Sequence, residues 1–203
     1  MDDSLQDRMN QILGSPPRVE PIAPEELDER VLEPINRMRE YRDYPLDAAV
    51  THPFYLTMGR SPEMFRSFMS LGVSVNVEST IPIRLRELAI LRCGWLCGAP
   101  YEWGEHVIGA KQAGLGSDEI ERVTRGSQAQ EWDEVDRTLL KAVEELHTDA
   151  MISDATWSAL SNDFDERQLV ELPVIIGHYH MTAFIQNSLR TPLNSTNPGL
   201  TAR

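Results

Sequence analysis

The stretch IRLRELAILRCGWLCGAPYEWGEHVIGAKQAG, residues 83–114, determines the predicted fold. Its first part, from Ile83 to about Leu96, is apolar almost all round, which is typical of a central helix rather than a surface one. Gly98, Ala99 and Pro100 then end this helix and begin another that continues to Gly114. Because the break is so short, the two helices are expected to fold back on each other as a hairpin.

Helical patterns also lie on both sides of this hairpin. Residues 14–24 are rich in proline and are expected to form an extended linker. Pro24 is expected to open a helix whose buried stripe is Leu27, Val31, Ile35 and Met38. Further helices are expected from Ser61-Pro62-Glu63, from Ser117, over Asp133–Leu146, from Ser153 and over Glu166–Leu189, the last of them too apolar in its middle to be exposed to solvent. No segment shows the alternation of a strand and no repeat is found, so the predicted fold class is all-α.

Composition restricts the classes of partner. The chain has 203 residues, enough for one domain with a good core and an additional arm. Its 19 Lys and Arg against 32 Asp and Glu leave a net charge of −13, and so acidic a surface repels nucleic acid and anionic lipid. No run of about 18 apolar residues exists, so no membrane span is expected. The expected partner is a small-molecule substrate, and a few arginines in one pocket would still allow it to be anionic.

Cellular location is inferred from the N-terminus and from the cysteines. MDDSLQDRMN lacks the basic start and apolar stretch of a signal peptide. The two cysteines, Cys93 and Cys97, lie within one predicted helix, which excludes a disulfide scaffold. We therefore expect a protein of the reducing cytoplasm.

Two titratable residues of the predicted hairpin fall on apolar helix faces. Glu87 has Ile83, Arg84 and Ile90 as neighbours one turn away, so its carboxylate needs a partner or must stay protonated. An ordinary ion pair with Arg84 is one interpretation. His106 shares a stripe with apolar residues, and a hydrogen-bonded core histidine is the ordinary interpretation there. The hairpin, however, brings both helices together, and a buried glutamate beside a histidine is an acid–base pair.

The segment ELAILRCGWLCGAPYEWGEHV, Glu87–Val107, resembles the signature of the carboxymuconolactone decarboxylase family, within the alkylhydroperoxidase D superfamily. The resemblance extends through AKQAGLGSDEIERV and returns weakly in GHYHMTAFIQNSLRTPL, covering roughly residues 45–193. It implies an alkylhydroperoxidase D-like helical domain. The expected organisation is an arm and linker with one helix over residues 1–44, this domain over 45–193 and a tail over 194–203.

The redox branch of the superfamily uses a Cys-x-x-Cys pair, a histidine that follows after three intervening residues, and a glutamate nineteen positions before that histidine. Glu87 and His106 have this spacing, whereas the two cysteine positions fall on Ala99 and Glu102. A thiol peroxidase needs a reactive thiolate and a resolving partner. Cys93 and Cys97, four residues apart on one helix, do not provide that pair and are interpreted as small buried hydrophobes.

Several residues are therefore expected to surround the proposed site. The catalytic candidates are Glu87, Glu102 and His106, although Glu102 could equally serve only the helix dipole. The substrate-binding candidates are Arg84, Trp95, Tyr101, Trp103 and Tyr179, with Arg92 as a second arginine for a substrate carboxylate. His178 and His180 are two apart on a helix and face different directions, so they cannot chelate one metal, and no other spacing of His, Cys or Asp resembles a metal site. Two carboxylates and an imidazole can move a proton without a metal or an organic cofactor, so no cofactor is expected.

The expected function is that of a cofactor-free acid–base enzyme, most simply a decarboxylating lyase. Its substrate would be a small carboxylated lactone or oxo acid from the catabolism of aromatic or similar compounds, as the resemblance implies. Isomerisation and elimination fit the same residues. A thiol peroxidase using Cys93 or Cys97 and a non-catalytic binding or assembly protein are the alternatives. A homo-oligomer, a trimer or hexamer, is also expected from the resemblance and from the proline-rich arm, which has too little apolar content to fold alone.

Overall fold

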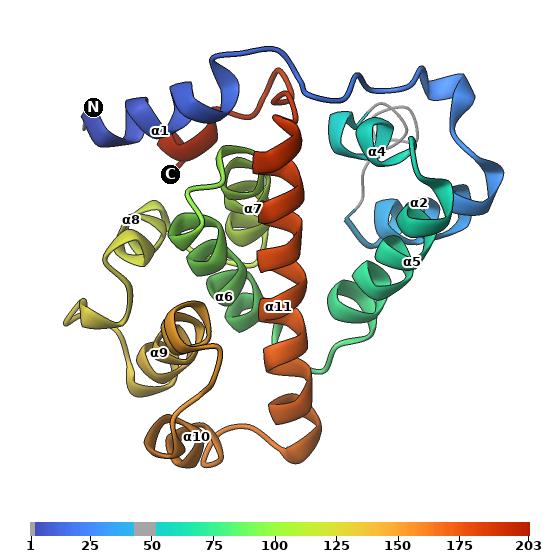
Figure 1. The fold of residues 1–203 in the computed structure, drawn as a ribbon. Helices are drawn as coiled ribbons and strands as arrows, with labels where there is room; N and C mark the ends of the chain where they lie inside the picture. The colour runs from blue at the N-terminus through green and yellow to red at the C-terminus, as the bar shows by residue number, and fades with distance from the viewer. Residues whose placement is uncertain (1–2, 43–51) are drawn as a thin grey trace. The chain divides into compact units, whose positions relative to one another are not determined.

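A computed structural model describes residues 3–42 and 52–203 of the chain, and these residues contain helices and no strand. They form two compact units (Figure 1). One unit contains the described residues up to Ser79 together with Ile185–Thr196, and the other contains Thr80–Phe184 and Asn197–Arg203. The all-α prediction is thus confirmed for the described residues, while the expected boundary at residues 44 and 45 lies outside them. None of the described helices is long and apolar enough to cross a membrane.

The first unit is built around a pair of packed helices, α2 (Glu29–Arg42) and α5 (Pro62–Val73). The predicted stripe on α2 is buried, with Val31 and Ile35 fully inaccessible to solvent. The other elements of this unit are α1 (Asp3–Leu13), the 3-10 turn η1 (Pro24–Glu26), α4 (Pro53–Met58) and the π-helical turn η2 (Ser74–Glu78). Helix α1 was not predicted from the sequence.

The helix predicted to open at Pro24 begins later than expected. The Glu26 carboxylate accepts a hydrogen bond from the Ala23 backbone N–H at 2.9 Å, which closes a single turn. Leu27 is then extended, with φ −60° and ψ 131°. The Asp28 carboxylate accepts the Arg30 backbone N–H at 2.8 Å, as an N-terminal cap does, and α2 begins beside it at Glu29. Two local side-chain caps therefore divide the expected helix.

The second unit contains the predicted hairpin. Helix α6 (Ile83–Leu96) packs against α7 (Pro100–Gln112), as expected. Gly98 has the left-handed φ of 52°, and the Ala99 N–H donates to the Gly94 carbonyl at 2.9 Å, the hydrogen bond of a Schellman cap. The remaining elements are α8 (Ser117–Arg125), η3 (Gly126–Gln128), α9 (Glu134–Asp149), α10 (Asp154–Leu160), α11 (Glu166–Leu189, grouped with the first unit from Ile185) and η4 (Gly199–Thr201).

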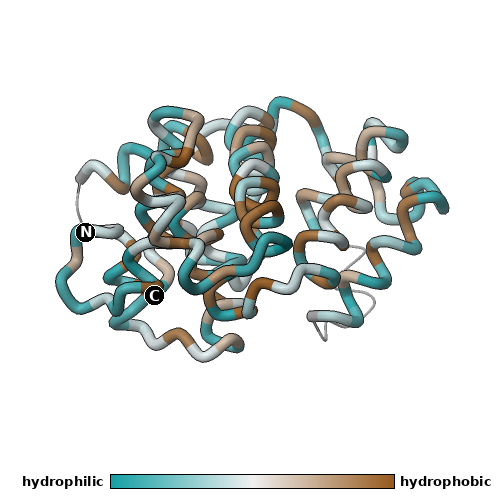
Figure 2. Tube along the Cα trace, turned by 90° about the horizontal axis from the view of Figure 1, so that it is seen from below, coloured by the Kyte–Doolittle hydropathy of each residue, from teal (hydrophilic) through white to brown (hydrophobic). Residues whose placement is uncertain are grey.

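Helix α6 is the centre of this unit, as its composition predicts. Leu88, Ile90 and Leu91 are completely buried. Hydropathy colours vary along the helices in Figure 2, because most helices carry one apolar and one polar face.

Ser153 accepts the Thr156 backbone N–H at 3.3 Å and so caps α10 as predicted.

Helix α11 differs in part from its prediction. Leu172, Ile175 and Ile176 are buried, whereas one stripe of apolar side chains is exposed. The members of this stripe, spaced three, four or seven residues apart, are Val170, Val174, Met181 and Phe184. A helix that is apolar on all sides can be buried entirely within its own chain, or it can leave one apolar stripe exposed. The sequence pattern of α11 did not distinguish these two cases.

The last residues of the chain are packed into the second unit. The indole N–H of Trp103 donates to the Ala202 carbonyl at 3.0 Å. The Asn197 amide donates to the Tyr101 carbonyl at 3.0 Å and to the Glu105 carboxylate at 2.9 Å. Residues 197–203 therefore hold one face of α7 in place.

Candidate functional site

Glu87 and His106 form a direct hydrogen bond between the two helices of the hairpin. The Glu87 Oε2 atom lies 2.8 Å from His106 Nδ1. The two side chains are 4% and 9% exposed, respectively. The bond joins residues nineteen apart in the sequence, the spacing from which the pair was predicted. The predicted contact between Glu87 and His106 is therefore present, and the proposed ion pair between Glu87 and Arg84 is not.

This contact determines how the imidazole is oriented. A carboxylate can only accept, so the Nδ1 atom of His106 carries the proton that it shares with Glu87. The neutral ring then has its lone pair on Nε2, the nitrogen farther from Glu87. A histidine oriented in this way can accept a proton at Nε2 as a base and return it as an acid.

Tyr179 and His178 of α11 lie beside this pair. The His106 and Tyr179 rings meet edge to face, with their centroids 4.8 Å apart. His178 packs against Tyr179 in the same manner at 5.3 Å. Burial, and secondly the charge of nearby His106, lowers the pKa of His178 to about 4, so that this ring is neutral at pH 7. Tyr179 thus fixes one side of the His106 ring.

Glu102 is buried in a different manner. It lies one turn before His106 on α7 and is 1% exposed. Neither carboxyl oxygen has a hydrogen-bond partner among the described residues. One of them packs near Gly94 of α6. Burial raises the pKa of Glu102 well above its ordinary value, because a charged carboxylate without a partner is costly to desolvate. Burial without a hydrogen-bond partner therefore favours the neutral, protonated form of Glu102.

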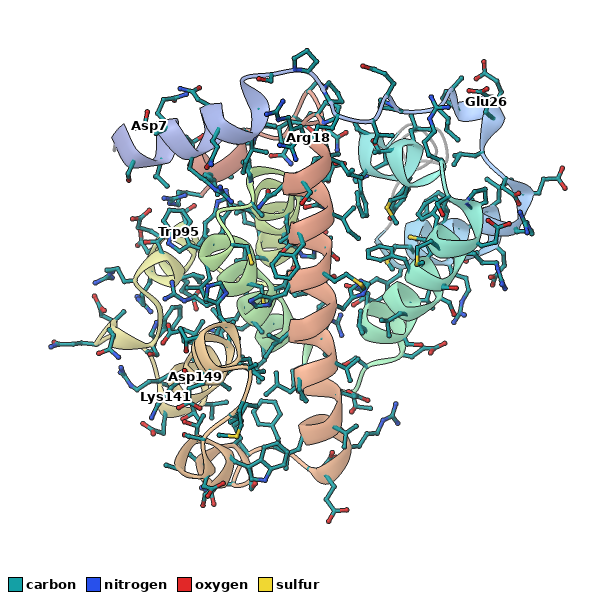
Figure 3. All side chains as sticks on the ribbon, viewed as in Figure 1. Asp7, Arg18, Glu26, Trp95, Lys141 and Asp149 are labelled. Carbon is teal, nitrogen blue, oxygen red and sulfur yellow. The ribbon has the colours of Figure 1, made fainter. Side chains whose placement is uncertain are left out.

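Three of the four predicted aromatic residues lie on the two helices of the hairpin. Trp95, labelled in Figure 3, lies near the end of α6, with its ring centroid 5.0 Å from that of Trp103. Trp103 and Tyr101 are buried, and the Arg203 guanidinium lies 5.4 Å from both indole rings. These contacts hold the C-terminal residues against the hairpin, and a role for the three rings in substrate binding stays a prediction.

The two arginines proposed to bind a substrate carboxylate are both occupied by carboxylates of the chain. Arg84 donates to both oxygens of Asp136 at 2.8 Å and to Glu119 at 2.6 Å. Arg92 donates to Glu144 at 3.0 Å and to two backbone carbonyls of α8. Their guanidinium groups hold α8 and α9 against α6, which is a structural role.

The cysteines differ from each other in their surroundings. Cys93 is fully buried, and burial raises the pKa of its thiol well above the ordinary value. Such a thiol is a poor nucleophile, because the reactive form is the thiolate. Cys97 is half-buried at the end of α6, where it lies near His147 and His180. Because this cluster comes from three distant segments, its members show no metal-ligand spacing in the sequence.

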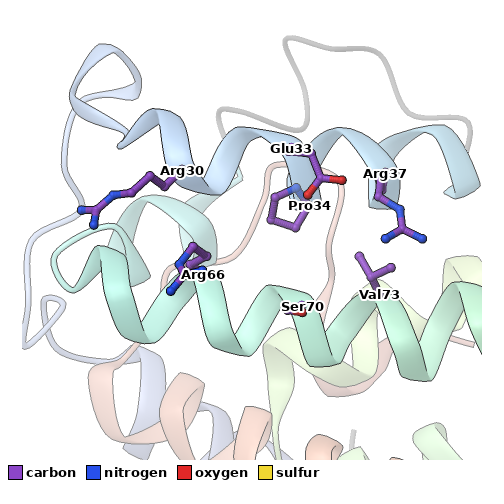
Figure 4. A pocket seen from close by; sticks show the side chains of 7 residues that line it. All are labelled: Arg30, Glu33, Pro34, Arg37, Arg66, Ser70 and Val73. Carbon is purple, nitrogen blue, oxygen red and sulfur yellow. The ribbon is translucent and has the colours of Figure 1, made fainter.

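The first unit has a pocket of its own. Figure 4 shows it between α2 and α5, with a volume of about 420 Å³. Its lining consists of Arg30, Glu33, Pro34, Arg37, Arg66, Ser70 and Val73. Arg30 is paired with Asp28 and Glu63, and Arg37 is paired with Glu78, so much of the positive charge is already neutralised.

Comparison with known proteins relates this chain to one family. Residues 62–145, which contain Glu87, Glu102 and His106, match the model of the carboxymuconolactone decarboxylase family. No curated protein matches the chain. Among solved structures, a protein of unknown function from Agrobacterium tumefaciens, described as a candidate antioxidant defence protein AhpD, is 24% identical, with a TM-score of 0.63 over 68% of this chain and 94% of its own.

Two further solved structures cover more of this chain. A peroxidase-related protein with an alkylhydroperoxidase AhpD core from Ralstonia eutropha JMP134 is 13% identical, with a TM-score of 0.75 over 89% of this chain and 94% of its own. The debrominase Bmp8 is 16% identical, with a TM-score of 0.71 over the same two fractions. At such identities the likeness concerns the fold, and the predicted alkylhydroperoxidase D-like fold is confirmed.

Proposed function

We propose that this chain, whose residues 62–145 belong to the carboxymuconolactone decarboxylase family, is an acid–base enzyme in which His106 transfers a proton and Glu87 orients it. The observation that carries the proposal is the buried 2.8 Å contact between Glu87 Oε2 and His106 Nδ1. An oriented imidazole contributes typically about a hundredfold to ten-thousandfold to a reaction rate. The family relation and the likeness to enzymes of known structure support an enzymatic role.

The reaction proposed is decarboxylation of a small carboxylated lactone or oxo acid. The bond from the substrate carbon to its carboxylate breaks, carbon dioxide leaves, and the electron pair moves into the carbonyl of the lactone or ketone. Protonated His106 then delivers a proton from Nε2 to that carbon. Glu87 stabilises the imidazolium before the transfer and holds the neutral ring afterwards. The substrate supplies the electron sink itself.

Glu102 provides a second proton in the same hairpin. Its neutral carboxyl group lies one turn from His106 on α7, with both oxygens buried. A carboxylic acid kept neutral by an apolar site can donate a hydrogen bond to a developing oxyanion. We assign this hydrogen-bond donation to Glu102. Tyr179, whose ring meets the His106 ring edge to face, is proposed to position that ring.

The thiol peroxidase alternative has less support in the site. The Cys-x-x-Cys positions hold Ala99 and Glu102, and the thiol of Cys93 is buried with a raised pKa. A peroxide-reducing thiolate needs the opposite, an exposed position and a lowered pKa. The buried contact between Glu87 and His106 supports proton transfer, and thiol chemistry at the half-buried Cys97 stays the alternative.

The experiment is a measurement of carbon dioxide release from a panel of small carboxylated lactones and β-oxo acids. We expect His106→Ala and Glu87→Gln to lose about a hundredfold or more in turnover while the fold persists. His52→Ala, a histidine of the first unit, is the matched control and should keep full activity. Turnover that survives in His106→Ala, or no turnover of any compound by the wild type, would contradict the proposal.

A homo-oligomer is proposed as the working form, a trimer or hexamer by resemblance to the family. The support comes from the exposed apolar stripe of α11, in which Val170 is 67% and Phe184 60% accessible. Large apolar side chains aligned on one helix face are typical of an association surface. Burial of this stripe against a second copy would remove it from water.

A further inference from the structure

Three potential metal ligands from distant segments converge in the second unit. Cys97 is the C-terminal capping residue of α6, His147 lies in the last turn of α9, and His180 lies in the middle of α11. One ligand atom of each residue lies within 4.8 Å of the others. The ring nitrogens His147 Nδ1 and His180 Nε2 are only 2.9 Å apart. Lys141 and Asp149, both labelled in Figure 3, mark the helix that carries His147.

The backbone orients one of these ligands. His180 Nδ1 lies 2.9 Å from the Ile176 carbonyl, one turn earlier on α11. A carbonyl only accepts, so Nδ1 carries the proton and the neutral ring presents the lone pair of Nε2 to His147 and Cys97. Metal-ligating histidines commonly have their other nitrogen held by a carbonyl or carboxylate in this manner. The Ile176 carbonyl thus orients His180 for metal binding, independently of how close Cys97 and His147 lie.

The distances approach those of a tetrahedral zinc site. Zinc bonds of about 2.0–2.1 Å to nitrogen and 2.3 Å to sulfur place neighbouring ligand atoms roughly 3.3–3.6 Å apart. The two nitrogens would separate by about half an ångström from their hydrogen-bonded distance of 2.9 Å, and the sulfur, now within 4.8 Å of them, would approach by at most about 1.2 Å. Rotation of side chains at the ends of α6 and α9 is sufficient for movements of this size.

We propose that Cys97, His147 and His180 form a binding site for Zn²⁺ with a fourth position for water. Thiolate and imidazole ligands suit zinc and not magnesium or calcium, which prefer oxygen. His147 is exposed and the other two residues are half-buried, so the site opens to solvent. Three protein ligands with one open position are the arrangement of catalytic rather than structural zinc sites.

Binding follows a defined proton balance. The S–H bond of Cys97 breaks, a sulfur–zinc bond forms, and the thiol proton passes to solvent. The proton on His147 Nδ1, which is shared with His180 in the metal-free protein, moves to Nε2 of the same ring through solvent, so that Nδ1 can bind the metal. No oxidation or reduction takes place. Near neutral pH, one proton is released for each zinc ion bound.

The experiment measures zinc binding by calorimetry on the untagged full chain, in two buffers with different ionisation enthalpies. We expect one zinc ion per chain and about one proton released, as the thiolate ligand requires. Titration with Co²⁺ should also give a thiolate-to-cobalt charge-transfer band. Neither measurement depends on a variant, and a result without proton release or without that band would overturn the proposal.

Variants locate the site. Cys97→Ser and His180→Ala should each weaken zinc binding by more than about a hundredfold. Mutation of a residue that only hydrogen-bonds to a metal ligand typically weakens binding by about tenfold to a hundredfold. His52→Ala, which changes a histidine of the first unit, is the control and should bind zinc as the wild type does. Circular dichroism confirms that each variant is folded. Equal affinity in wild type and folded Cys97→Ser, or binding lost only in a control, would place the metal elsewhere and refute the site.

Discussion

Replacement of Glu102 by glutamine tests whether the buried carboxyl group is held neutral. The substitution preserves the size of the side chain and removes its ability to ionise. In the folded chain the carboxyl is 1% exposed and its oxygens have no partner among the described residues, and burial raises its pKa well above 4.5. In the unfolded chain the same group ionises at its ordinary pKa. The two states therefore bind different numbers of protons above about pH 4.5.

The sign and size of the effect follow from this difference. Above pH 4.5 the folded wild type keeps the Glu102 proton and the unfolded chain loses it, so the free energy of unfolding falls as pH rises. The contribution is fully present below pH 4.5 and decreases by about 1.4 kcal/mol per pH unit until the folded carboxyl itself ionises. For a chain of this length, such a change corresponds to roughly 3–6 °C in melting temperature per pH unit.

The assay compares urea unfolding of the wild type and Glu102→Gln between pH 5 and pH 8. Subtraction of one free energy from the other cancels the titration of all other groups. The glutamine amide adds a cost of about 1–3 kcal/mol for its unpaired donors, but this offset does not depend on pH. We expect the variant to gain stability relative to the wild type as pH rises. A difference that stays constant across this range would refute the buried neutral acid.

Three other predictions concern separate parts of the chain. Gly126→Ala should destabilise by at least about 1 kcal/mol in urea unfolding, because φ is +66° and a Cβ would lie 2.0 Å from the Glu144 carboxylate; Gly177→Ala, where the Cβ meets nothing within 4 Å, is the control. Cys93→Ser should lose about 1–3 kcal/mol by burying a hydroxyl, and a coupled assay should show no dithiol-dependent reduction of hydroperoxides by the wild type. Light scattering should give a mass that is a multiple of 23.0 kDa and that decreases in Phe184→Asp; a wild-type monomer would contradict the oligomer.

The hairpin and its acid–base pair could be predicted because both depend on local information. The positions of Gly98 and Pro100 determine where α6 ends and α7 begins. Helical periodicity then places Glu87 and His106 on facing sides. A contact between adjacent helices joined by a short turn needs no knowledge of the rest of the chain.

Contacts between distant elements could not be predicted in this way. Arg84 was a candidate for a substrate carboxylate, but it binds Asp136, which is 52 residues away on α9. The cluster of Cys97, His147 and His180 likewise exists only because α6, α9 and α11 meet. Periodicity indicates which face of a helix is buried, but not which distant helix covers it.

The shared proton of Glu87 and His106 is the central claim, and nitrogen NMR of the His106 ring measures it directly. At a pH where the ring is neutral, we predict a proton on Nδ1 and a lone pair on Nε2, since Nδ1 lies 2.8 Å from the Glu87 carboxylate. In Glu87→Ala this preference should weaken toward the mixture of tautomers found in a free imidazole. A neutral His106 protonated on Nε2 in the wild type, or an unchanged tautomer in Glu87→Ala, would contradict the account.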